Sequence, residues 1–435
     1  MINQLPLEIL TKIFLTTLPA SWASTRPFGV RLTVSHVCRY WREVCLHTPQ
    51  MWQHIELDQG KSDWREHDVE ALSEYLRRSA AATISFTMSA YCARIPIVWT
   101  LLLAEAHRWR SVRFVLHDVE KLSSTISFDQ PLEVPALKCV SMMTPITLLP
   151  LGAIDLTDNP VRWFSDAPRI RYLSLAWPFL PPVVHVAWDR ITHLELDWNG
   201  PDTAESESLR GCVGALQQCV ALEYLEVFAY KLQWGEPLPI IELPTLQTLV
   251  LDKDAVVLCC YLRVPRLERL SFCPNTFLLS VDRCEALTML ARRQSLQRLR
   301  YLYLTYSLFE WAHLNPMLEQ LPELTDLHLI HSPFRSSRGT PPRVCSLGQL
   351  RSLRTLSLDI SEAEWYLRNQ LPGLPELLEA EITKLSNLEK LDLWNRPEQG
   401  ARPDLDEWID RQSKRGVEVE RRSGWHTFPD EMDLW

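Results

Sequence analysis

Apolar residues at helical spacing open the chain. Between Pro6 and Thr17 they recur every three or four positions, and proline suits the first position of a helix, so the pattern predicts a short helix here. Two apolar rows run along this segment. One consists of Ile9 and Ile13, and the other consists of Leu7, Leu10 and Phe14. A helix with apolar residues on more than one face needs cover on two sides.

A second helix and a short turn are predicted next. Residues 31–46 form one continuous helical pattern, with an apolar stripe made of Val34, Val37, Cys38, Trp41 and Cys45. Thr48 can cap a third helical turn that begins at Pro49 and carries Met51 and Trp52. Three such short helices cannot bury two-sided apolar surface alone, so the excess must contact the following domain or another chain.

A different pattern, apolar-x-x-apolar-x-apolar, repeats from residue 137 onward. Each occurrence predicts one short strand whose first, fourth and sixth residues point toward a core, as in Leu324, Leu327 and Leu329. Shorter alternating segments near Ile55 and Ile84 lead into the first full unit. The units lie on average about 28 residues apart. Their first residues are Leu137, Ile170, Ile191, Leu222, Leu246, Leu267, Leu299, Leu324, Leu353 and Leu388.

On helix pattern alone, the N-terminal helices are best explained as a cap on the strand repeats. Residue identities favour another hypothesis. Leu5-Pro6-x-Glu8-Ile9-Leu10, Ile13-Phe14, Val37-Cys38-Arg39-x-Trp41 and Pro49-x-x-Trp52 closely resemble the F-box family. The connection between Leu18 and Leu32 is longer than usual in that family and resembles fungal F-box-like proteins. The strand pattern resembles a degenerate leucine-rich repeat.

The two resemblances imply an α/β protein in three parts. An F-box domain spans 1–55, and a leucine-rich-repeat-like solenoid spans 56–420, with parallel strands on its concave face and helices and loops on its convex face. A C-terminal tail spans 421–435 and is expected to be disordered in part. The F-box resemblance implies binding to an SKP1-like adaptor and, through it, to a cullin. Its matching positions, expected to build the module or face SKP1, are Leu5, Pro6, Ile9, Leu10, Ile13, Phe14, Val37 and Trp41.

Charge and composition narrow the class of partner. With a net charge of -9, the chain lacks the clustered basic surface that nucleic acid requires. No apolar stretch approaches the ~20 residues of a membrane-spanning helix. The 11 cysteines include no C-x-x-C pair, which favours free thiols in a reducing compartment. We therefore expect an intracellular protein, cytoplasmic or nuclear, that binds other proteins.

Recognisable catalytic motifs are absent from the sequence, and only 13 glycines are present. His328 and His331 have no cysteine or carboxylate companions at ligand spacing, so neither a metal nor a cofactor is expected. Three hypotheses remain. The chain is a substrate receptor of an SKP1-cullin-F-box ubiquitin ligase, or a repeat scaffold that binds SKP1 or stands alone without a role in ubiquitylation, or an unrecognised enzyme. We favour the first and expect no enzymatic activity.

The strand repeats also suggest where a target protein binds. At the third, fifth and seventh positions of the units, seven acidic residues stand against two basic ones, with several aromatic residues among them. A target with a basic segment would fit. The alternative is that the acids keep an exposed sheet soluble while the aromatics pack on neighbouring strands. The candidates at these positions are Glu195, Asp197, Tyr224, Glu226, Tyr301, Tyr303 and Trp394, and Trp198 lies just beyond them.

Overall fold

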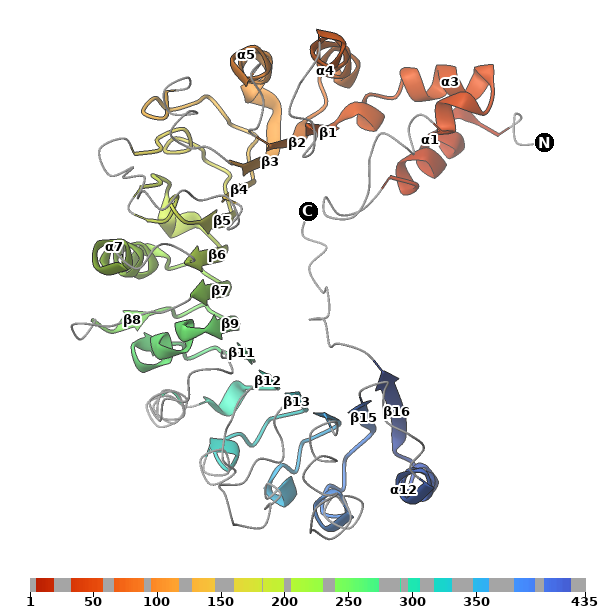
Figure 1. Cartoon of the computed structure of the whole chain (residues 1–435), viewed down its shortest axis with the longest axis vertical. Coiled ribbons are helices and arrows are strands. Elements are labelled where there is room, and N and C mark those ends of the chain that lie inside the picture. Colours follow the sequence, from red (N-terminus) through yellow and green to blue (C-terminus); the bar gives the residue numbers. More distant parts are fainter. Residues whose placement is uncertain are drawn as a thin grey trace. The chain divides into compact units, whose positions relative to one another are not determined.

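The computed structural model describes residues 5–18, 33–57, 66–89, 95–116, 127–144, 160–181, 183–198, 205–229, 239–273, 290, 296–305, 317–330, 347–359, 379–395 and 403–423. The chain divides into two compact units between Gln218 and Cys219. Each unit combines a parallel sheet with helices (Figure 1). The expected division into 1–55, 56–420 and 421–435 stays a prediction.

The first unit begins with short helices, as predicted, but the second of them is broken. Helix α1 spans Leu7–Thr16 and α3 spans Arg39–Leu46. Residues 33–36 are helical, yet Cys38 is extended, with φ -158° and ψ 171°. Its Sγ accepts a hydrogen bond from Trp41 N at 3.4 Å, which satisfies an amide that the first turn leaves open. The prediction of one continuous helix over 31–46 was therefore wrong.

A 3₁₀ helix, η2, follows at Pro49–Trp52, where a third helical turn was predicted. Thr48 precedes it, but the Thr48 side chain makes no capping hydrogen bond to η2. Its hydroxyl instead donates to the Val44 carbonyl at 2.7 Å. Thr48 thus closes the end of α3 and leaves the start of η2 to proline, whose missing N–H needs no partner.

The strands described in the first unit all run parallel, each paired with the next along the chain. They are β1 (His54–Leu57), β2 (Ile84–Ser89), β3 (Trp109–Val115), β4 (Cys139–Met143), β5 (Tyr172–Ala176) and β6 (His193–Trp198). Helices α4 (Glu66–Ser79), α5 (Ile95–Ala104) and α7 (Glu205–Gln218) lie on one side of these strands (Figure 1). That side holds the core, where Trp99 of α5 packs on Phe114 of β3 at 6.0 Å between ring centroids.

The second unit repeats this arrangement. Its strands pair in parallel in the order β7 (Tyr224–Ala229), β9 (Thr248–Lys253), β11 (Arg269–Cys273), β12 (Tyr301–Thr305), β13 (Asp326–Ile330), β14 (Thr355–Asp359), β15 (Lys390–Asn395) and β16 (Glu418–Ser423). A separate pair joins β8 (Ile241–Glu242) to β10 (Leu262–Arg263). The unit also contains η6 (Asp254–Cys260), η7 (Leu296–Arg298), η8 (Leu347–Gln349) and α12 (Pro403–Lys414).

The strand predictions are confirmed in position and direction. The first residue of every predicted unit is buried, and a strand begins two residues after it; Leu222 precedes Tyr224, for example, and Leu324 precedes Asp326. The last strand, β16, runs on to Ser423, where Arg421 and Arg422 pair with Leu393 and Trp394.

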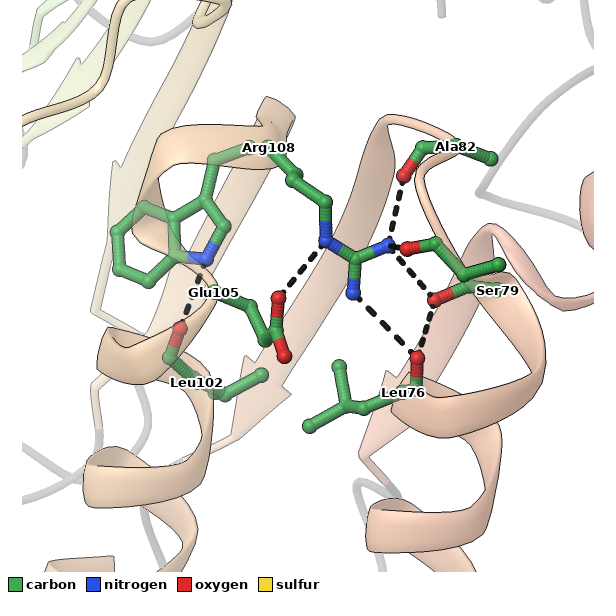
Figure 2. Close-up of polar contacts among 8 residues, drawn as sticks. Leu76, Ser79, Ala82, Leu102, Glu105 and Arg108 are labelled. Carbon is green, nitrogen blue, oxygen red and sulfur yellow. Dashed lines mark hydrogen bonds and ion pairs between the residues drawn. The ribbon is translucent and has the colours of Figure 1, made fainter.

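A buried arginine ties α4 to the loop that follows it and to the start of β3 (Figure 2). Arg108 lies at the end of η3 (Ala106–Arg108) and is 7% exposed. Its Nη1 donates to Ser79 Oγ at 3.1 Å, to the Ala82 carbonyl at 2.9 Å and to the Ala80 carbonyl. Its Nε donates to Glu105 Oε2 at 2.8 Å. The guanidinium thus supplies the donors that the C-terminal end of α4 lacks.

Candidate functional site

The N-terminal helices close around a small apolar core. Leu10 and Phe14 of α1 are 0% and 1% exposed, and they pack with residues from α3 and η2. Phe14 meets Trp41 at 5.1 Å between ring centroids. The other buried members of this core are Val34, Val44, Cys45, Met51 and Trp52. One face of α1 is therefore fully used inside the module.

Trp52 joins this module to α4. Its indole N–H donates to the Cys45 carbonyl at 3.0 Å, which fixes the ring at the end of α3. Tyr75 of α4 contacts the ring edge-on at 4.9 Å between centroids, and the Arg78 guanidinium lies 4.5 Å from the ring centroid. Edge-to-face and cation–π contacts of this kind are favourable. The helical module is thereby held against the rest of the first unit.

Four large apolar side chains of the module are exposed. Ile9 and Ile13, one turn apart on α1, are 48% and 41% exposed, Leu7 is 52% exposed and Val37 is 57% exposed. In the described parts of the chain, the other exposed large apolar side chains are Ile97, Val220 and Ile240, which lie outside the module. An apolar cluster in one small module is typical of a protein-binding surface.

The eight predicted F-box residues separate into an inner and an outer group. Leu10 and Phe14 are buried, and Trp41 and Leu5 are half-buried. Pro6, Ile9, Ile13 and Val37 are exposed. Val37 leaves the predicted apolar stripe because the chain is extended at Cys38. Which of the exposed residues contact a partner stays a prediction.

In the first unit, the acidic candidates lie on the sheet face opposite the core. Glu195 and Asp197 are half-buried and alternate along β6 with the buried Leu194 and Leu196. The Tyr172 hydroxyl donates a hydrogen bond to Glu195. Trp198 is 7% exposed and follows the alternation of the leucines, so its side chain lies on the core side of β6. Its burial argues against its expected place on the open face.

In the second unit, the aromatic candidates are partly covered. Tyr224 is 8% exposed and its hydroxyl donates to Glu226 at 2.6 Å, and Tyr303 is only 1% exposed. Tyr301 and Trp394 are half-buried. Tyr301 contacts His328 at 4.9 Å between ring centroids, and the Arg422 guanidinium lies 5.4 Å from the Trp394 ring centroid. For Tyr303 and Tyr224, the hypothesis that the aromatic side chains pack on neighbouring strands therefore fits better than the hypothesis that they are exposed to bind a target.

The described residues include no group of three or more His, Cys, Asp or Glu placed to hold a metal ion. His328 lies among aromatic rings, and His331 falls outside the described residues. None of the helices in the described ranges has both the length and the apolar content that crossing a membrane requires. The cysteines described by the structure are free thiols.

Comparison with known proteins bears on the N-terminal module. Residues 2–58 match the family model described as F-box-like, and this range covers the helices from α1 to η2 and strand β1. The match supports an F-box protein, and F-box domains typically bind SKP1 adaptors. No curated protein matches the chain.

Proposed function

We propose that the chain is the substrate-recognition adaptor of an SKP1-cullin-F-box ubiquitin ligase. One observation carries the proposal. In the module that matches the F-box-like family, Ile9 and Ile13 lie one turn apart on α1 and are exposed, whereas Leu10 and Phe14 of the same helix are buried in the module's own core. The exposed pair is free to be covered by an SKP1-like adaptor. Through SKP1 the chain would reach a cullin.

The rest of the chain would present the target. We infer a leucine-rich-repeat-like solenoid over 56–420. Parallel strands recur along the chain, the first residue of each sequence repeat is buried, and helices lie on one side of the strands within each compact unit. Such an adaptor performs no chemistry itself. It raises the local concentration of target lysines near the conjugating enzyme. The place of action would be the cytoplasm or the nucleus.

The target surface would be the open sheet face, and the target would carry a basic segment. Glu195 and Asp197 supply the acidic groups in the first unit, and Glu226 does so in the second. Tyr301 and Trp394 are half-buried and keep some surface for contact, whereas Trp198, Tyr224 and Tyr303 would act by supporting their neighbours. Exposed charges are screened within ~10 Å at 0.1 M salt, so target capture should weaken as salt rises.

A second candidate function is an SKP1-binding or free-standing scaffold with no role in ubiquitylation. The two are separated by purifying partners from cells with the proteasome blocked. The native chain is compared with Ile9→Ser/Ile13→Ser, in which the helical core is untouched. A receptor yields partners whose ubiquitylated forms accumulate with the native chain and not with the variant. Partners that bind both forms and whose turnover is independent of the proteasome would contradict the proposal.

A further inference from the structure

Three basic residues follow one another along the edge at which the strands of the first unit begin. Arg110 of β3, Lys138, which precedes β4, and Arg171, which precedes β5, occupy the same register position on neighbouring strands. The Lys138 amide donates to the Arg110 carbonyl at 2.8 Å, and the Arg171 amide donates to the Lys138 carbonyl at 2.9 Å. All three residues are exposed. With strands about 4.8 Å apart, this basic row is roughly 10 Å long.

The basic row has no acidic partner within the described residues. The side chains of Arg110 and Lys138 make no hydrogen bond or ion pair there, and Arg171 Nη1 donates to the Ile170 carbonyl at 2.8 Å. Burial raises the pKa of the Cys139 thiol, and the charges of Arg110 and Lys138 both oppose that rise, so both charges lie near Cys139. Like charges side by side on neighbouring strands destabilise a sheet. The folded chain therefore carries a repulsion that its described residues do not relieve.

The same position in the second unit shows how the fold relieves such a repulsion. Arg300 lies beside Glu268, whose carbonyl accepts a hydrogen bond from the Arg300 amide at 2.9 Å. Arg354 lies beside Glu389, with 3.7 Å between Arg354 Nη1 and Glu389 Oε1. Each of these arginines thus has an acidic residue on a neighbouring strand. The basic row lacks such a neighbour, although the chain has 54 acidic residues and only 45 basic ones, so a shortage of acids does not explain it.

The geometry of the basic row favours a run of carboxylates as its ligand. Cations spaced by one strand each form a line, which suits several separate anionic groups better than one, and about four residues of an extended peptide span it. A nucleic acid needs a larger basic surface than three side chains on a chain with net charge -9. Glu133 and Asp166, which are exposed in the segments leading into β4 and β5, add negative charge nearby, so the attraction acts at short range.

We propose that Arg110, Lys138 and Arg171 bind a run of acidic side chains in a target protein. The inference rests on the proposed function, since it assumes that the strands, and not the helical module, carry the target. It adds a second recognition element to that function. The target combines the basic segment that fits Glu195 with an acidic run that crosses the starts of β3, β4 and β5, and this run supplies the carboxylates that the second unit supplies for itself.

The test measures binding of a fluorescein-labelled peptide with six consecutive glutamates to the full chain, by fluorescence anisotropy at low ionic strength. The same peptide with six glutamines and a glycine peptide with one phosphoserine are the comparison probes. Arg110→Gln/Lys138→Gln is the test variant, and Arg171 is kept because its side chain bonds to the backbone. Arg300→Gln/Arg354→Gln is the matched control, because it removes the same charge from exposed residues at the same position of the second unit.

The native chain and the control should bind the glutamate peptide, and the test variant should bind it roughly threefold to thirtyfold more weakly. Exposed charge pairs each contribute little, so the difference between the variants should shrink as salt is raised. The melting temperature of the test variant should not fall, because the two substitutions relieve a repulsion between neighbouring strands.

Equal binding by the test variant and the control would overturn the inference, as would equal binding of the glutamine peptide. Tighter binding of the phosphoserine peptide, lost in the test variant, would assign the basic row to a phosphoryl group and exclude the acidic run.

Titration of SKP1 against the same chains keeps the two proposals apart. The test variant should bind SKP1 as the native chain does, and a loss of that binding would make the adaptor, and not the target, the acidic partner. A native chain that binds the glutamate peptide but not SKP1 would contradict the proposed function alone. One that binds SKP1 but not the peptide would contradict this inference alone.

Discussion

Replacing Arg108 with methionine should loosen α4 from the sheet of the first unit. Methionine fills a similar volume but donates no hydrogen bond. The change removes the donors that reach Ser79 Oγ and the Ala80 and Ala82 carbonyls, together with the ion pair to Glu105 (Figure 2). The acceptors left behind near the C-terminal end of α4 would have no comparable partner.

The size of the effect follows from burial. Removing one partner of a fully buried ion pair costs ~3–5 kcal/mol, and each buried acceptor left unsatisfied costs ~1–3 kcal/mol. The Arg108 side chain is 8% exposed, but the Glu105 side chain is 30% exposed and can turn toward water. We therefore expect less than the cost of breaking a fully buried pair with all its acceptors, about 2–4 kcal/mol in the free energy of local opening.

Amide hydrogen exchange of the full chain measures this locally, because unfolding of a chain with two units need not follow a two-state transition. A loss of 2–4 kcal/mol corresponds to exchange that is roughly thirtyfold to several hundredfold faster in α4 and the turn before β2. Arg77→Met is the matched control. Arg77 lies on the same helix with its side chain 71% exposed and contacts Glu74, so its loss should leave exchange unchanged. Equal exchange in Arg108→Met and Arg77→Met would refute this account of the network.

Three further predictions concern the module, the thiols and the target surface. Trp52→Ala should weaken the attachment of the helical module to α4, because it removes the contacts to Tyr75 and Arg78 and about 3–5 kcal/mol of packing. Limited proteolysis should then cut faster near η2, and an unchanged cleavage rate would contradict this expectation. Burial raises the pKa of the Cys212 and Cys259 thiols. In the native chain at pH 8, alkylation followed by mass spectrometry should therefore label half-buried cysteines such as Cys260 first. Early labelling of Cys259 would argue against its burial. The variant Glu195→Lys/Asp197→Lys/Glu226→Lys should lose target capture and keep SKP1 binding; retention of the same partners would place the target site elsewhere.

The strand pattern was readable from sequence because its physical cause is local and repetitive. An apolar residue at the first, fourth and sixth positions has to be buried in every unit. The offset between that first residue and its strand, as between Leu324 and Asp326, is therefore the same from unit to unit. Helix α1 could also be predicted from the sequence, because Pro6 and the spacing of the apolar residues both indicate a helix that begins there. The break at Cys38 was not, because its neighbours fit a helix and only the capping bond to Trp41 shows that the helix restarts.

The site was harder to predict from the sequence, because it depends on contacts between segments that are distant in the chain. Tyr75 and Arg78 meet Trp52 across more than twenty residues of sequence, and nothing in the spacing of α4 indicates it. Tyr303 fits the surface positions of the repeat and Trp198 lies just beyond them, yet packing buries both side chains.

The binding of SKP1 to the full chain, titrated by calorimetry, tests the central proposal most directly. Ile9 and Ile13 are each about half exposed, so covering them is worth ~1 kcal/mol apiece, and Ile9→Ser/Ile13→Ser should weaken binding at least tenfold without lowering the melting temperature. Ile97→Ser is the control, because Ile97 is 50% exposed on α5, outside the module. We predict tight binding by the native chain and by Ile97→Ser, and weak binding by the double variant. No binding by the native chain, or equal binding by a folded double variant, would contradict the proposal.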